Sequence, residues 1–229
     1  MMTLLIATRN AHKVGEIQAI LGPQFQCLTL NDFPAAPRVI EDAETFAGNA
    51  IKKAVALARW QAAEPATCNL QPATPKFVLA DDSGLEVDAL NGTPGVHSAR
   101  FAALGGHENS QDADNNTKLL RLLKDVPLDK RTARFRCVIA LALVPHGTVE
   151  SSSPVCFADE LEAQVFDGAC EGRIQFSASG HGGFGYDPLF LPDGLTQSFA
   201  ELGEAVKNQL SHRAQALAKL KAFLNAGRD

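Results

Sequence analysis

The sequence predicts a single α/β domain built on a mixed β-sheet that is flanked by helices. A short apolar strand opens the chain and a helix follows it directly, which is how α/β proteins commonly begin. Strand and helix patterns then alternate, and one pair of strands is expected to be joined by a short turn, which requires antiparallel neighbours. No stretch resembles a linker, so we expect residues 1–229 to form one domain with at most two lobes.

The first third of the chain shows this alternation most clearly. Residues 3–7 form the opening strand, and apolar side chains recur at three- and four-residue steps in a helix that begins near Lys13. A second strand is expected near residues 26–30. A helix is expected over residues 45–63, because its first residue is a threonine, a preferred cap. The proline-containing residues 64–76 are expected to form an irregular surface loop.

The remaining elements are predicted from apolar runs that lie between turn signals. They are a strand over residues 77–80 that ends at the polar turn 81–84, a helix over 115–124, a central strand over 133–144, a strand over 155–166 paired with it through a turn at 145–147, a strand over 184–191 after a glycine-rich turn, and a last helix from about Ser211.

Composition and charge narrow the functional class. Hydrophobic residues make up 45% of the chain and charged residues 21%, which are ordinary values for a globular protein. The net charge of −5 argues against a protein that coats nucleic acid, so no nucleic-acid partner is expected. A small phosphate ligand remains compatible with this charge, because a few local Lys and Arg side chains can hold one.

Cysteine usage and the N-terminus predict a cytoplasmic protein. The cysteines are odd in number, widely spaced and lack a C-x-x-C pair, which fits neither a zinc site nor a disulfide framework. They are Cys27, Cys68, Cys137, Cys156 and Cys170. The apolar run of residues 4–7 is too short for a signal peptide or a membrane span, so no membrane partner is expected.

The segment between the first strand and the first helix is a candidate phosphate site. Backbone N–H groups at a helix start attract anions, and Lys13 adds a positive charge. The segment lacks the glycines and the G-K-[ST] ending of a P-loop. Taken alone, such a segment is more often a plain polar turn.

Carboxylates form the second candidate group. Asp81 and Asp82 follow an apolar strand, where ligands bind in open α/β sheets and where carboxylates can bind a cation and accept a proton. An ordinary Asp/Ser/Gly turn is an equal alternative. Glu41 precedes the helix that carries Asn49 and Lys53, which share a face; a helix cap and a solvated edge are the alternatives.

Two further segments are suited to a flat, polar ligand. Residues 182–188 combine glycines, which allow close approach, with the aromatic rings of Phe184 and Tyr186. Lys207 and residues 211–213 place hydrogen-bond donors near the start of the last helix, where a serine cap is the simpler interpretation.

Together these segments resemble the inosine triphosphate pyrophosphatase family, the non-canonical purine nucleoside-triphosphate pyrophosphatases. Each segment is weak alone, but they occur in the family's order from residue 4 to beyond residue 213, nearly the whole chain. They are residues 5–10 with Lys13 and Glu16, Glu41 with residues 45–46 and 49–54, residues 80–85, residues 94–95 and 98–100, residues 182–188, and Lys207 with residues 211–213.

The resemblance implies a two-lobed fold with an elongated mixed sheet, a nucleotide cleft between the lobes, and a homodimer. It implies Mg²⁺-dependent hydrolysis of ITP, dITP or XTP between the α- and β-phosphates, which releases the nucleoside monophosphate and pyrophosphate. By this resemblance Asp82 is the catalytic base, and Glu41 and Asp82 hold the metal. The implied nucleotide-binding residues are Thr8, Arg9, Asn10, Ala11, His12, Lys13, Lys53, Ser83, Phe184, Gly185, Tyr186, Asp187, Lys207, His212 and Arg213.

This sequence departs from the family pattern at Arg9 and His12, where many members have glycine. Both residues add bulk to the phosphate segment. For base selectivity, donors on Lys207, His212 or Arg213 would pair with a six-position carbonyl and oppose the amino group of adenine. Two rival functions are a Maf-like pyrophosphatase for modified pyrimidine triphosphates and a nucleotide sensor without turnover; the carboxylates argue against the sensor.

Overall fold

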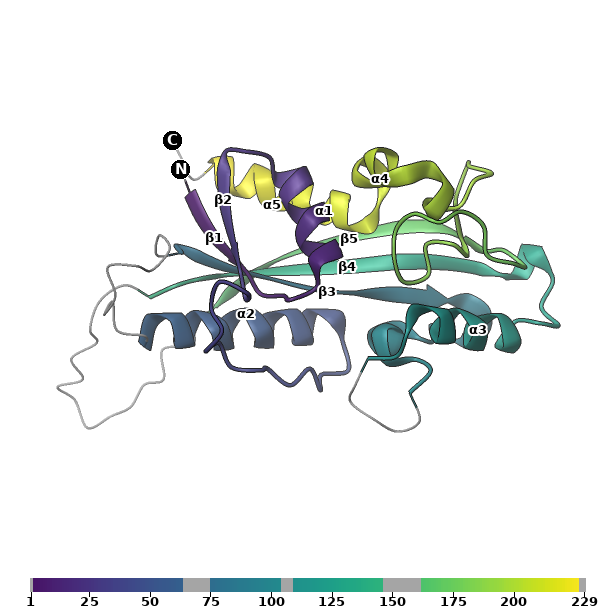
Figure 1. The fold of residues 1–229 in the computed structure, drawn as a ribbon, viewed down its shortest axis with the longest axis horizontal. Helices are drawn as coiled ribbons and strands as arrows, with labels where there is room; N and C mark the ends of the chain where they lie inside the picture. Colours follow the sequence, from purple (N-terminus) through teal and green to yellow (C-terminus); the bar gives the residue numbers. More distant parts are fainter. Residues whose placement is uncertain (1, 64–74, 104–108, 146–161, 227–229) are drawn as a thin grey trace.

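One mixed β-sheet runs the length of the molecule (Figure 1). The computed structural model describes residues 2–63, 75–103, 109–145 and 162–226. Its strands lie in the order β2-β1-β3-β4-β5-β6. Their bounds are β1 Met2–Ile6, β2 Phe25–Thr29, β3 Phe77–Val87, β4 Thr132–Leu143, β5 Ala163–Ile174 and β6 Phe190–Pro192. The predicted α/β class with a mixed sheet is therefore confirmed.

The sheet combines a parallel edge with an antiparallel body. β1 pairs in parallel with both β2 and β3, while β3, β4, β5 and β6 are successively antiparallel. The three long strands β3, β4 and β5 extend well beyond the short parallel strands, which makes the sheet elongated (Figure 1).

Helices cover both faces of this sheet. The α-helices are α1 Ala11–Leu21, α2 Phe46–Ala63, α3 Asp112–Leu122, α4 Phe199–Leu210 and α5 His212–Ala226, and short 3₁₀ helices span Asp88–Leu90, Gly95–Arg100 and Leu128–Lys130. Helices α2 and α3 lie on one face, and α1, α4 and α5 lie on the other (Figure 1). Among the described helices, none is long and apolar enough to cross a membrane.

Three apolar clusters hold the helices on the sheet. One packs α2 against strands β1 to β4 through residues such as Ala50, Leu57 and Ala140. A second packs α1 and α5 on the opposite face, and a third fills the far end of the sheet around Phe190 and Phe199. The active-site candidates from α1, α2 and α5 are therefore anchored by separate cores on the two faces.

Local capping explains where the first two helices begin. The Asn10 side chain accepts a hydrogen bond from the backbone of Lys13 at 3.1 Å, so α1 begins at Ala11, slightly before the predicted start. Thr45 accepts from the backbone of Gly48 at 3.0 Å, as its predicted capping role requires. The helix predicted over residues 115–124 begins earlier, at Asp112.

The predicted turn at residues 81–84 is wrong, because these residues lie inside β3 and pair with β4 as far as Val87. The acidic pair suggested a strand end. A strand can contain buried carboxylates here because cations from two helices neutralise Asp81 and an amide from a third contacts Asp82.

Two predictions in the C-terminal half are also corrected. The partner of β4 is β5 at Ala163–Ile174, later than the predicted 155–166; residues 146–161, with most of the predicted turn, lie outside the described part, as do residues 64–74 of the predicted loop. The strand predicted over 184–191 is reduced to β6, because Gly183 and Gly185 adopt positive φ angles of 71° and 63° that end extended structure.

Helix α4 was not predicted from the sequence. It has a complete capping box, in which Ser198 and Glu201 each accept a backbone hydrogen bond from the other. Gly203, with a φ angle of 78°, interrupts the helix and obscures its periodicity. The α4–α5 junction at Ser211 places Lys207 on one side and His212 and Arg213 on the other.

The fit of α5 on β5 depends on Gly168. A Cβ at this position would lie 2.1 Å from the carbonyl oxygen of His212 and 2.7 Å from the nitrogen of Ala216.

We expect Gly168→Ala to lower the free energy of unfolding by roughly 1–3 kcal/mol, as overpacking does, because α5 must move. The matched control is Gly15→Ala at an exposed position of α1, where an added Cβ meets no atom outside its own helix within 4 Å, and this change should be stabilising. Denaturant unfolding of both variants measures this; equal stability of Gly168→Ala and the wild type would contradict it.

Candidate functional site

The candidate site lies where β1 ends beside β3. β1 pairs with β3 only as far as Ile6 opposite Leu79, and the backbone of Ala7 adds one more bond to Leu79. Within the described residues, the next strand-like contact on this edge of β3 is the bridge between Glu86 and Pro94. Side chains from both faces of the sheet can therefore reach the open edge between these points.

A cavity of about 280 Å³ occupies this edge. Its size is near the lower limit of small-molecule sites, roughly 300–1,000 Å³. Its walls come from the β1–α1 segment, α2, β3, the 95–100 segment, α3, the 184–187 segment, α4 and α5. The lining includes Thr8, Asn10, Lys13, Glu41, Lys53, Asp81, Asp82, Ser83, Arg100, Asn109, Ser110, Asp112, Phe184, Gly185, Tyr186, Asp187, Lys207, His212 and Arg213.

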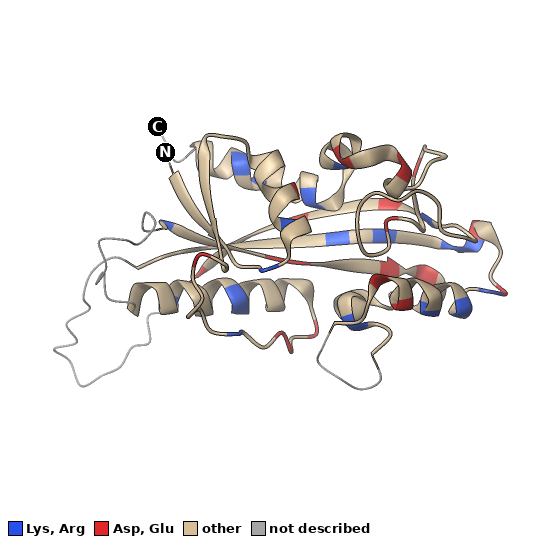
Figure 2. Ribbon diagram, in the orientation of Figure 1, with Lys and Arg blue, Asp and Glu red and all other residues tan. Residues whose placement is uncertain are grey.

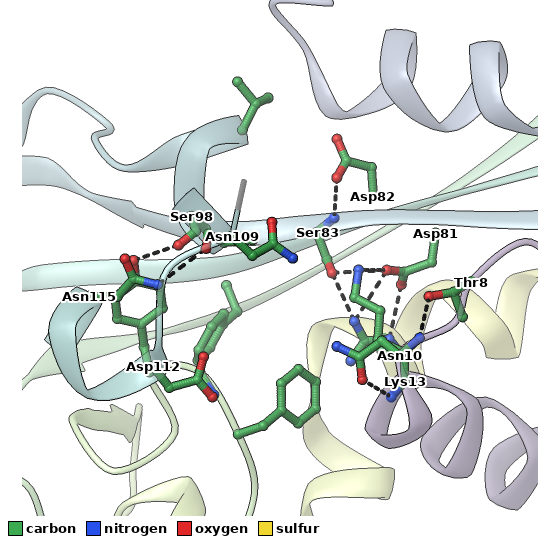
Figure 3. Close-up of a pocket in the computed structure, with 18 of the residues that line it drawn as sticks. Thr8, Asn10, Lys13, Asp81, Asp82, Ser83, Ser98, Asn109, Asp112 and Asn115 are labelled. Atoms are coloured by element: carbon green, nitrogen blue, oxygen red, sulfur yellow. Dashed lines mark hydrogen bonds and ion pairs between the residues drawn. The ribbon is translucent and has the colours of Figure 1, made fainter. Parts of the chain in front are cut away.

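Asp81 and Asp82 point to opposite sides of β3 (Figure 3). This follows from the alternation of side chains along a strand. Asp81 faces α1 and α5 together with Ser83, whose hydroxyl donates to it at 3.0 Å, and Asp82 faces α2. The two neighbouring carboxylates therefore have different environments.

On the Asp81 side, six buried or half-buried charges alternate in sign, and we call them the buried ion chain. Its members in order are Lys13, Asp81, Arg213, Glu16, Lys207 and Asp187. Arg213 lies 2.9 Å from Asp81, and Lys207 lies 2.7 Å from Glu16 and 2.5 Å from Asp187. The acidic middle of β3 lies beside the basic start of α1 (Figure 2). The ion chain thus connects β3, α1, α4, α5 and the 184–187 segment.

Pairing stabilises the charged forms of Asp81 and Lys13 in this chain. Burial alone would raise the pKa of Asp81, but Arg213 and Lys13 outweigh it and hold the pKa well below its usual range. Burial would likewise lower the pKa of Lys13, and Asp81 reverses that effect. Lys13 therefore keeps its positive charge at the cavity wall, where an anion would bind.

On the other side of β3, Asp82 is held by an amide. The Nδ2 of Asn49 donates to its Oδ2 at 3.0 Å, and the backbone N–H of Ser83 donates to its Oδ1 at 3.1 Å. Burial raises the pKa of Asp82 to about 6, although Lys13 and Lys53 oppose that effect. Asp82 is therefore a stronger base than a free carboxylate and is still mostly ionised at neutral pH.

Glu41 is the second carboxylate on this side. It forms an ion pair with Lys53 at 2.9 Å, and its negative charge contributes to the raised pKa of Asp82. No group of three or more His, Cys, Asp or Glu residues suited to a metal occurs in the described part of the chain. Two carboxylates are nevertheless the donor set that Mg²⁺ commonly uses when substrate phosphates and water complete its shell. The residues present therefore fit Mg²⁺.

The far end of the cavity is aromatic and polar. The Phe184 ring lies 4.4 Å from the Lys207 ammonium, and its backbone N–H donates to Asp187 at 2.8 Å. The His212 ring stacks on Phe135 with centroids 4.8 Å apart. Burial, reinforced by Arg213 and Lys207, lowers the pKa of His212 well below its usual range, so its imidazole is neutral.

The sequence relationships agree with this geometry. The model of the Ham1 family matches residues 4–223. The chain belongs to the Ham1 family. The predicted relationship is confirmed by this match and by the relatives that share it, as well as by solved structures of Ham1 proteins.

Relatives of this Ham1-family chain match it over nearly their full length. A protein from Desulforamulus reducens named dITP/XTP pyrophosphatase is 46% identical, with 98% of this chain and 96% of the relative covered. One of the same name from Geobacter sulfurreducens is 45% identical, with 98% and 97% covered. The solved Ham1 protein of Staphylococcus aureus is 35% identical, with a TM-score of 0.74 and coverage of 99% and 100%.

Most of the residues singled out in the sequence meet in the cavity of this Ham1-family chain, but three from the phosphate segment do not line it. Arg9 lines a neighbouring cavity and donates to the carbonyl of Ala36 at 3.3 Å. Ala11 and His12 are exposed at the start of α1, and the His12 ring stacks on Phe184. The consecutive residues His212 and Arg213 are both buried and both line the cavity, while Ser211 caps α5.

The hydrogen bonds also decide which of Lys207, His212 and Arg213 is available to bind a purine base. All three guanidinium nitrogens of Arg213 donate to protein, to Asp81, Glu16 and Ser83. The ammonium of Lys207 is likewise paired twice. The buried Nδ1 of His212 has no hydrogen-bond partner in the described residues. His212 is therefore the better placed of the three to meet a ligand.

Sequence reasoning missed several residues that shape the site. The only signal in the sequence for the contact of Asn49 with Asp82 is that Asn49 shares a helix face with Lys53. Glu16 joins Lys207 to Arg213, and Asp112 accepts from the backbone of Gly185 at 2.6 Å. Nothing local in the sequence indicates these last contacts, because each one joins segments far apart in the chain.

The pairing of Arg213 yields a prediction about its removal. Arg213→Ala leaves the buried carboxylates of Asp81 and Glu16 without their shared partner, which should cost roughly 3–5 kcal/mol of unfolding free energy. Turnover of ITP and ATP should fall together, because the site itself is disturbed. Arg173→Ala, whose partner Asp193 lies 3.9 Å away at the surface, is the control and should be near neutral. Thermal unfolding and both activities are measured; a stable variant with altered ITP preference alone would contradict this role.

Proposed function

We propose that this chain is a Mg²⁺-dependent nucleoside-triphosphate pyrophosphatase for non-canonical purine nucleotides such as ITP, dITP and XTP. The observation that carries the proposal is a single cavity with cations at one end, a basic carboxylate between, and an aromatic, polar pocket at the other. Membership of a family whose relatives are named dITP/XTP pyrophosphatase supports the choice of substrate. It also favours this function over a Maf-like activity or a sensor.

The triphosphate is proposed to lie along the β1–α1 segment. Thr8, Asn10 and Lys13 line the cavity there, at the positive end of α1, and Lys53 approaches from α2. Lys13 and Lys53 would hold the outer phosphates as one leaving unit. Arg9, Ala11 and His12 are part of the same segment; we propose backbone contacts to phosphate for Arg9 and Ala11.

Asp82 is proposed as the general base. A water molecule beside it would give a proton to the carboxylate while its oxygen attacks the α-phosphorus, and the bond from that phosphorus to the bridging oxygen would break. Asn49 fixes the carboxylate for this task through the bond to its Oδ2. Glu41 and Asp82 would hold Mg²⁺, which when bound neutralises phosphate charge and helps pyrophosphate to leave.

The purine is proposed to lie at the aromatic end, near Phe184, Gly185, Tyr186 and Asp187. Tyr186 donates to the carbonyl of Ser98 at 2.8 Å, so it shapes the wall, while Ser83 and Lys207 complete it. The neutral His212 would donate to a six-position carbonyl and oppose an amino group. Arg213 and Lys207 support this pocket through the buried ion chain.

We further propose that residues 1–229 form one domain with two lobes around this cavity, that the enzyme is a cytoplasmic homodimer, and that it acts on free nucleotides. The two lobes and the homodimer are what the resemblance implies, and the cytoplasmic location follows from the cysteine usage.

The products of ITP test the proposed function. Attack at the α-phosphorus gives IMP and pyrophosphate, whereas attack at the γ-phosphorus gives IDP and orthophosphate. We expect chromatography to show IMP first, with activity lost in EDTA and restored by Mg²⁺. ATP should be used roughly ten- to a hundredfold less efficiently, because its amino group meets a donor. IDP as the first product would refute the proposal, and full activity in EDTA would remove the metal from it.

The base is tested by Asp82→Asn. This change keeps the size of the side chain but removes the charged proton acceptor, so kcat for ITP should fall on the order of a hundredfold or more. Asp129→Asn, an exposed carboxylate in the Leu128–Lys130 helix, is the control and should keep wild-type turnover. Near-normal turnover by a folded Asp82→Asn enzyme would exclude Asp82 as the base.

A further inference from the structure

His12, in the first turn of α1, makes an aromatic contact with Phe184. The two rings are nearly parallel, with an interplanar angle of 18° and centroids 5.4 Å apart. His12 belongs to the first turn of α1, and Phe184 belongs to the segment that leads into β6. This stack therefore connects the phosphate end of the cavity to its aromatic end.

The backbone around Phe184 does not by itself fix the orientation of the Phe184 ring. Gly183 and Gly185 flank it, both with positive φ angles. Gly185 is held by α3, through Asp112 and through Asn116, whose Nδ2 donates to its carbonyl at 3.0 Å. These bonds fix the main chain but not the aromatic ring, whose position depends on the side chains around it.

Three side chains lie next to the Phe184 ring. Lys207 and Arg213 lie 4.4 Å and 5.9 Å from its centroid, and both line the cavity, as Phe184 itself does. His12 is exposed and does not line the cavity. The imidazole thus packs on Phe184 from outside the ligand space, where it supports the ring and leaves the cavity open.

We propose that His12 is a positioning residue that holds Phe184 in place as the stacking surface for the purine base. The proposal rests on the proposed function and adds a role for a residue of the phosphate segment that does not contact phosphate. With the imidazole removed, Phe184 samples other orientations, and binding of the base has to order it again. Ligands that carry the purine lose affinity, while ligands made only of phosphate keep it.

Kinetics with two inhibitors separate these roles. We compare His12→Ala, His12→Phe and the wild type for ITP turnover and for competitive inhibition by IMP and by inorganic tripolyphosphate. In His12→Ala we expect KM for ITP and the inhibition constant of IMP to rise about two- to tenfold, the range of one aromatic pair. The kcat and the inhibition constant of tripolyphosphate should stay within about twofold. His12→Phe should restore the wild-type values.

The matched control is His181→Ala, another exposed histidine, in the same loop as Phe184 and outside the cavity lining. It should behave as the wild type. If His12→Ala weakens tripolyphosphate but not IMP, His12 is a phosphate ligand and the proposal is wrong. It is also wrong if neither inhibitor changes, or if His12→Phe is as impaired as His12→Ala.

A stability cycle tests the stack independently of any substrate. His12→Ala, Phe184→Leu and the double variant are unfolded in denaturant, and the coupling between the two changes is calculated. We expect a coupling of about two- to tenfold in the unfolding equilibrium constant. Absence of coupling would overturn the proposal even if ITP is hydrolysed. A clear coupling in a protein that does not hydrolyse ITP would instead reject the proposed function and leave the contact established.

Discussion

The buried ion chain is the constraint on which the arrangement of the site depends. Three cations and three anions alternate from Lys13 to Asp187, and none could be buried alone without a large loss of solvation energy. Each charge is therefore tied to the position of its neighbours. Because the members come from α1, β3, α4, α5 and the 184–187 segment, their pairing fixes how these segments meet. The same pairing keeps Lys13 ionised where a triphosphate would need it.

The short β1 strand gives this chain its access to ligand. β1 ends beside Leu79, whereas β3 continues to Val87. Beyond Leu79, the edge of β3 that β1 pairs with is therefore not covered by β1. Alternation along that strand sends Asp81 towards one layer of helices and Asp82 towards the other. Of the two adjacent carboxylates, Asp81 is therefore a structural member of the ion chain. Asp82 is the basic group that faces Glu41 and Lys53.

The division of labour between these two aspartates is electrostatic. Asp81 is surrounded by Arg213 and Lys13, which outweigh its burial, and its pKa is low. Asp82 has an amide and a backbone N–H as its direct partners, and burial raises its pKa. A carboxylate whose charge is fully paired makes a stable structural member, and a carboxylate that is less fully paired retains the basicity that proton transfer requires. At the other end of the cavity, burial reinforced by Arg213 and Lys207 lowers the pKa of His212 and keeps its imidazole neutral.

The sequence by itself determined the α/β class, the strand–helix opening, the helix capped by Thr45 and the family, because these depend on local periodicity, local caps and ordered motifs. It also identified most residues that line the cavity. It did not determine the extent of β3, because the acidic pair resembles a turn until Lys13, Arg213 and Asn49 are placed beside it. The sequence did not predict helix α4, because Gly203 interrupts its periodicity. It placed the partner strand of β4 too early, because the extent of β5 is decided by its pairing with β4. Only the tertiary structure decided that Asp81 and Asp82 face apart, that Arg213 is committed to carboxylates, and that His12 rests on Phe184. The first follows once both aspartates are known to lie inside a strand. The other two join residues distant in the chain, and the energy of such contacts depends on burial and distance, which local sequence does not encode.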